Sequence, residues 1–115
     1  HEFRILSEPI SENAYELAKM LFNKERFWEV HEILESVWRN KSGDEKKILH
    51  GIILLAAAFV HSQKNRNEVA LSILKRAYEE LKNYEYSYNG FDLRLIKEKI
   101  SEMLKNKEVR PFKLT

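Results

Sequence analysis

The chain contains no cysteine, which excludes disulfide bonds and thiolate metal sites and leaves the redox compartment undetermined. Glycine occurs three times and proline twice, so few residues interrupt regular structure. The longest apolar run, Ile52–Val60, is far shorter than the ~20 residues that a membrane-spanning helix needs. No signal-peptide pattern is visible at the start. These absences predict a soluble, cytoplasmic protein with no membrane partner.

An excess of charge of one sign is also lacking. Charged residues make up 33% of the 115 residues, yet the net charge is only +2. A dedicated nucleic-acid-binding protein usually carries a basic excess or stripe, so this class of partner is not expected. A solvated, thermophile-like surface explains the balanced charge. Apolar residues make up 43%, enough for one domain of this length to bury a core without the help of disulfide bonds or a structural metal ion.

Apolar residues recur at helical spacing in five segments, and no run has the pattern of a strand. Short connections between such segments produce antiparallel neighbours. We therefore predict an all-α fold, a single compact bundle of about five helices packed as antiparallel helical hairpins. The domain spans residues 1–115, with a C-terminal tail at 107–115. The expected helices are Pro9 or Ser11 to Phe22, Arg26–Asn40, Glu45–Gln63, Asn67–Tyr84 and Leu93–Asn106.

Three polar residues are expected to set helix boundaries. Asp44 and Asp92 precede helical segments and are predicted as N-caps, whose carboxylates accept backbone N–H groups. Asn65 tolerates a left-handed conformation and can end the third helix. Residues 83–90 are predicted to form a loop whose tyrosines cover a helix junction with their hydroxyls in water. The tail is expected to pack through Phe112 or Leu114.

The stretch at residues 27–39, "FWEVHEILESVWR", contains the first candidate site. At ~100° per residue, its aliphatic residues and Trp38 form one apolar arc. His31 and Glu35 extend this arc, and their i, i+4 spacing lets their side chains touch. Glu29 and Glu32 fall on the solvated side. Trp28 lies at the edge of the arc, where either the core or a partner can cover it.

The third helix repeats this pattern, because His50 and His61 share one face with Ala57. Counting from the turn near residues 42–43 places His50 level with Glu35 and His61 level with the start of the second helix. His31, Glu35 and His50 then form one candidate cluster, with Trp38 beside it and His61 in a separate one. The two histidines of the third helix are ~16 Å apart along its axis, too far to serve one metal ion.

Three interpretations of these residues remain open. A buried carboxylate beside an imidazole satisfies both groups and fixes helix register. Two histidines and one glutamate, His31, His50 and Glu35, are also a sufficient set of ligands for a divalent metal such as zinc. Finally, His31 and Glu35 are candidate acid–base catalysts, although no nucleophile or phosphate loop accompanies them. The stretch "HEILE" lacks the second histidine of HExxH, and no pair of E-x-x-H motifs indicates a di-iron bundle.

The motif stretch, with the helix "ILHGIILLAAAFVHSQKNRNEVA" after it, resembles the domain of unknown function family 309, small all-helical proteins of bacteria and archaea. The resemblance covers about residues 20–105 and implies a compact helical bundle without an assigned activity. His50 and Leu54 stand where the family pattern has glutamines, Asn65 and Arg66 replace Gly-Asn, and Val69 replaces a later glycine. The residues that match the pattern are His31, Glu32, Glu35, Trp38, Gly51, Ala56, His61 and Ala70.

Two functions are compatible with these observations. The favoured one is a non-catalytic helical module that self-associates or binds a protein partner through an exposed apolar helix face, with no cofactor. The alternative is a small metal- or ligand-dependent enzyme, hydrolase-like, centred on His31 and Glu35. A pocket open to solvent at these residues would distinguish the two.

Overall fold

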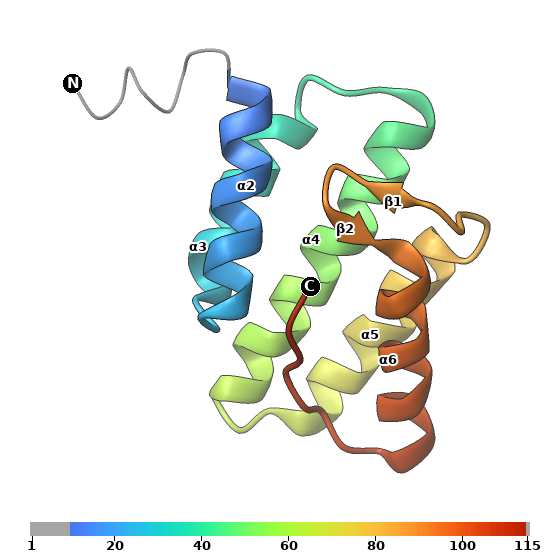
Figure 1. The fold of residues 1–115 in the computed structure, drawn as a ribbon. Helices are drawn as coiled ribbons and strands as arrows, with labels where there is room; N and C mark the ends of the chain where they lie inside the picture. The colour runs from blue at the N-terminus through green and yellow to red at the C-terminus, as the bar shows by residue number, and fades with distance from the viewer. Residues whose placement is uncertain (1–9, 115) are drawn as a thin grey trace.

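The computed structural model describes residues 10–114, which form five helices and one short hairpin (Figure 1). This confirms the predicted all-α bundle, while the proposed start at Pro9 lies outside the described residues. In chain order the elements are α2 (Ile10–Asn23), α3 (Phe27–Trp38), α4 (Gly43–Gln63), α5 (Asn67–Leu81), β1 (Ser87–Tyr88), β2 (Phe91–Asp92) and α6 (Leu93–Asn106).

Helix α4 is central, because α3 packs on one of its sides and α5 on the other (Figure 1). Helix α2 packs against α3, and α6 packs against α5, so neighbours in sequence are neighbours in space. At one end of the core, the ring centroids of Phe22 and Phe27 are 5.2 Å apart, and those of Phe27 and Phe59 are 4.7 Å apart. No helix within residues 10–114 is long and apolar enough to cross a membrane.

The helix boundaries follow local chemistry at two of the three predicted positions. Asn65 ends α4 in the left-handed region, at φ 61°. The Asp92 carboxylate accepts 3.1 Å hydrogen bonds from the second and third backbone N–H groups of α6, which confirms it as an N-cap. The prediction for Asp44 was wrong, because α4 begins at Gly43 with Ser42 as the N-cap. Asp44 lies in the first turn, where a carboxylate still complements the helix dipole.

The prediction of a plain loop at residues 83–90 was also wrong. Helix α5 ends at Leu81, and β1 pairs antiparallel with β2, so that Tyr88 lies opposite Phe91. Asn89 and Gly90 connect the strands, both with positive φ (47° and 90°). Asn-Gly is the preferred pair for such tight hairpin turns. The strands are two residues each, too short for an alternating pattern to be visible in the sequence.

Tyr88 departs from the expectation of solvated tyrosines, because its side chain is only 7% exposed. Its hydroxyl shares a 2.8 Å hydrogen bond with the hydroxyl of Tyr15, which joins the hairpin to α2. Burial, followed by this hydrogen bond, raises the pKa of Tyr88 far above its ordinary value of 10.0. The hydroxyl of Tyr84 donates to Asp44 at 2.9 Å, while Tyr86 is 53% exposed.

Alkaline pH is therefore expected to destabilise the fold through Tyr88. Because its pKa is raised in the folded protein, the unfolded chain releases the proton first, and stability falls as pH rises above about 10. Urea unfolding between pH 9 and 11 measures this slope. Tyr88→Phe should show a shallower decline, and Tyr86→Phe, which removes an exposed hydroxyl, is the control. Equal slopes in wild type and Tyr88→Phe would contradict the assignment.

Candidate functional site

The candidate residues of α3 and α4 lie on one side of the helix pair. The middle of α4, residues 48–59, is buried except at His50 and Ala57, which are half-buried like His61 one turn later; their spacing places these three residues on one face. On α3, His31, Glu35 and Trp38 are likewise half-buried. We call the surface that they form with Trp28 the α3–α4 face; its members are Trp28, His31, Glu35, Trp38, His50, Ala57 and His61.

At one end of this face, Trp38 is surrounded by cationic and titratable groups. The rings of Trp38 and His50 are 6.0 Å apart, and the Lys46 ammonium lies 4.4 Å from the centre of the indole, a cation–π distance. His50 Nδ1 is 3.4 Å from a carboxylate oxygen of Glu80 on α5. These residues line a shallow depression of about 310 Å³ together with Gly43 and Lys47.

The partner of His50 is therefore Glu80. A pairing of His50 with Glu35, one of the alternatives left open by the sequence, is not among the hydrogen bonds and ion pairs within residues 10–114. The reason is the close approach of α5 at Gly51. A Cβ atom at Gly51 would lie 2.6 Å from Leu81 Cγ and 3.3 Å from the Glu80 Cβ atom. Because only glycine permits this approach, α5 brings Glu80 against His50. The turn at Asn65 could have revealed the pairing, since residues 50 and 80 are equidistant from it.

The three-residue cluster of His31, Glu35 and His50 is not assembled as a set of metal ligands. Within residues 10–114, no group of three or more histidine, aspartate or glutamate side chains lies close enough to hold a metal ion. His31 instead stacks on the exposed indole of Trp28, with ring centroids 5.7 Å apart and the planes parallel to within 1°. The α3 helix thus directs His31 toward its own N-terminal end.

Three polar atoms of the α3–α4 face are buried and have no hydrogen-bond partner in the described part of the chain. They are Nδ1 of His31, Nε1 of Trp38 and Nδ1 of His61. Such atoms are costly in a monomer, because each loses its water without gaining a protein partner. His61 lies near the α2–α3 turn, as Gln63 two residues later donates to the Glu25 carbonyl at 3.1 Å.

Taken together, the fold and the face define a small all-α domain with a half-buried aromatic and histidine surface. The sequence pattern of the family described as "Domain of unknown function (DUF309)" matches residues 15–73, more than half of the chain. The chain belongs to this family, as the resemblance at the motif indicated. The match covers α2 from Tyr15 onward, all of α3 and α4 and the first part of α5, so it includes the whole α3–α4 face.

A curated relative aligns with a longer part of the chain. It is an uncharacterized protein of Aquifex aeolicus (strain VF5), 29% identical over 93 residues. The alignment covers 80% of this chain but 28% of the relative. The chain thus spans less than a third of the length of the curated relative that it matches.

Proposed function

We propose that this domain is a non-catalytic helical module that self-associates through the α3–α4 face. The single observation that carries the proposal is Trp28, whose side chain is 58% exposed although its ring is held against His31. Tryptophan is enriched at the energetic centres of protein interfaces, where a fixed aromatic surface loses little conformational entropy on binding. An indole that is already stacked is preorganised in this sense.

The charges of the face favour a second copy of the chain as the partner. Glu35 supplies an acidic side chain within the face on α3, and the basic side chains of Lys46 and Lys47 border the face, where they line the depression beside Trp38. In a two-fold dimer the same patch meets itself in reverse, so a surface with both signs of charge is self-complementary.

Replacing Trp28 by alanine is expected to weaken self-association about 30-fold, as truncating a central tryptophan costs about 2 kcal/mol or more. Analytical ultracentrifugation over a concentration series measures the dissociation constant. Tyr86→Ala, which removes another exposed aromatic ring outside the face, is the matched control and should leave the constant unchanged. A wild-type protein that stays monomeric at millimolar concentration, or a Trp28→Ala variant that associates normally, would reject the proposal.

A further inference from the structure

The C-terminal segment, residues 108–114, lies in an aromatic groove as an extended chain, and we call it the strap. It leaves α6 through Lys107, passes α4 and reaches the C-terminal end of α2 at Asn23 (Figure 1). The Phe112 ring contacts Phe22 and Phe59 at centroid distances of 5.5 and 5.9 Å. Leu114, two residues later, is only 3% exposed. This confirms the expected anchors of the tail.

The groove recognises the strap partly through its backbone. The Asn23 side chain donates from Nδ2 to the Leu114 carbonyl at 2.9 Å and accepts at Oδ1 from the Leu114 N–H at 2.6 Å. One amide thus satisfies both polar groups of one extended residue, as a neighbouring strand does. Recognition of this kind requires an extended segment with an aromatic residue two positions before an aliphatic one, a Phe-x-Leu pattern.

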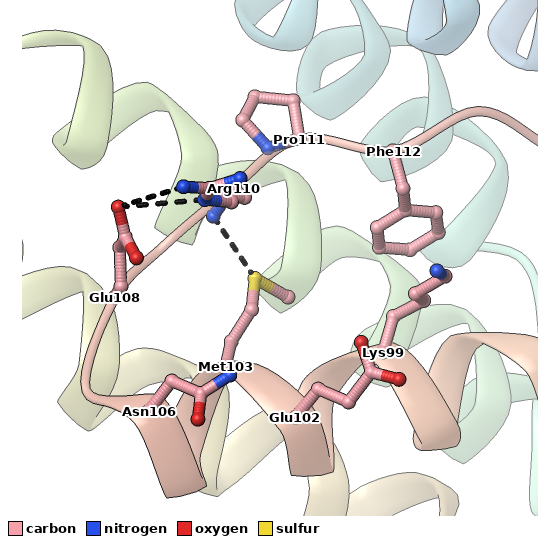
Figure 2. Close-up of a pocket in the computed structure, with 8 residues that line it drawn as sticks. All are labelled: Lys99, Glu102, Met103, Asn106, Glu108, Arg110, Pro111 and Phe112. Carbon is pink, nitrogen blue, oxygen red and sulfur yellow. Dashed lines mark hydrogen bonds and ion pairs between the residues drawn. The ribbon is translucent and has the colours of Figure 1, made fainter.

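The first half of the strap is held by one buried apolar side chain, Val109, which is 9% exposed, and by a 3.1 Å hydrogen bond from the Glu108 N–H to the Met103 carbonyl. A cavity of about 400 Å³ lies between its first half and α6, lined from the helix by Lys99, Glu102, Met103 and Asn106 (Figure 2). Arg110 crosses this space with a 3.3 Å contact from its N–H to Met103 Sδ, and its side chain pairs with neighbouring Glu108 on the strap itself. The apolar contacts of the strap are thus made by Val109, Phe112 and Leu114, all within seven consecutive residues, so the strap can detach as a unit.

The hinge that precedes the strap also opposes its closed position. Lys107 has φ 56° and ψ 36°, the left-handed conformation, in which its Cβ is crowded by the following carbonyl oxygen. Glycine is the usual residue at such a helix end. A straightened hinge would relieve the strain and send the strap away from its own groove.

From these observations we propose that the groove is a binding site for an extended Phe-x-Leu segment, and that its intermolecular occupant is the strap of a second copy. An exchanged strap forms the same contacts with Asn23 and the phenylalanine rings of the partner copy. Each straightened hinge gives up the hydrogen bond from the Glu108 N–H to the Met103 carbonyl and relieves the crowding at Lys107. The proposal does not depend on the α3–α4 face, because the groove residues that hold the strap are Phe22 and Asn23 of α2 and Phe59 of α4, which lie outside that face.

Complementation between two full-length variants tests it. Asn23→Ala damages the groove and leaves the strap intact, whereas the double variant Phe112→Ala/Leu114→Ala damages the strap and leaves the groove intact. Both variants also carry Trp28→Ala, which removes association through the α3–α4 face. Energy transfer between a donor label on one variant and an acceptor label on the other reports their association.

We expect the mixture to associate at least ~10-fold more tightly than either variant alone, because only the mixture pairs an intact strap with an open groove. The matched control replaces the double strap variant with Lys113→Ala, which alters an exposed strap residue between the two anchors. Its own strap should still fill the groove, so this mixture should not associate more tightly. A mixture that associates no more tightly than its components means that the groove serves only its own strap, which overturns the proposal.

A second test uses a variant at the hinge, which leaves all core side chains in place and so does not depend on how the core responds to substitution. Lys107→Gly removes the crowding at the hinge and should favour the closed strap, weakening exchange of otherwise wild-type straps at least ~5-fold. Sedimentation in the Trp28→Ala background measures this directly. An unchanged dissociation constant would also overturn the proposal, since exchange would then not involve the hinge.

Discussion

Gly51→Val is expected to lower the free energy of unfolding by about 3 kcal/mol, the upper part of the range for overpacking a well-filled core. Any side chain at this position meets Leu81, whose Cγ atom would lie 2.6 Å from the added Cβ atom and whose side chain is fully buried. Helix α5 must then shift away from α4, and the ion pair between His50 and Glu80 should be lost with it. Urea unfolding monitored by circular dichroism measures the change.

A matched substitution on the same helix separates this clash from the general cost of a β-branched residue. Ala57→Val introduces valine at a half-buried position of α4, and the expected cost is below about 1 kcal/mol, from helix propensity. The double variant Gly51→Val/Leu81→Ala should lose less free energy of unfolding than the two single variants together, because the two side chains occupy the same space. Equal losses for Gly51→Val and Ala57→Val would show that the close helix approach does not limit stability.

Phe59→Ala is expected to destabilise the protein by about 3–5 kcal/mol, the cost of a large cavity in a rigid core. The Phe59 ring is fully buried on α4 and contacts the rings of Phe22, Phe27 and Phe112 at 4.7 to 5.9 Å. For a domain of this size, such a loss is a large part of the total stability. Thermal unfolding measures the effect as a fall in Tm.

Tyr86→Ala is the control for Phe59→Ala, because it removes an aromatic ring of which half is already in water. Its effect should remain within about 0.5 kcal/mol, as for other surface substitutions. If Phe59→Ala cost less than about 1.5 kcal/mol, the aromatic rings around α4 would not be a tightly packed part of the core.

The sequence was sufficient for the features that local chemistry decides. The periodicity of apolar residues located all five helices in residues 10–114, and Asn65 and Asp92 marked two boundaries through their backbone and capping preferences. The strap anchors, Phe112 and Leu114, could be chosen because few other residues near the end are apolar. Each of these inferences requires only neighbours in the sequence.

The contacts of the candidate site could not be predicted in the same way. His50 pairs with Glu80 of α5, and this pairing depends on the close approach of α5 to α4 at Gly51. Lys97 was not recognised as an inward residue, because a lysine on an apolar face is usually solvated. Its ammonium is buried and bonds to Glu85 at 2.5 Å and to the Lys82 carbonyl at 3.2 Å, which anchors the α5–β1 connection on α6.

The pair of hydrogen bonds between the Asn23 side chain and the Leu114 backbone, called the clasp below, also has a consequence for the order of folding. It joins residues 91 positions apart, whereas most other packing in the domain joins helices that are adjacent in sequence. Closing so long a loop carries an entropic cost that local hairpins avoid, so the clasp forms after the hairpins. During synthesis the N-terminal helices are complete before Leu114 exists. The aromatic end of the core is therefore the last to close, and until then any extended aromatic segment in reach can compete for it.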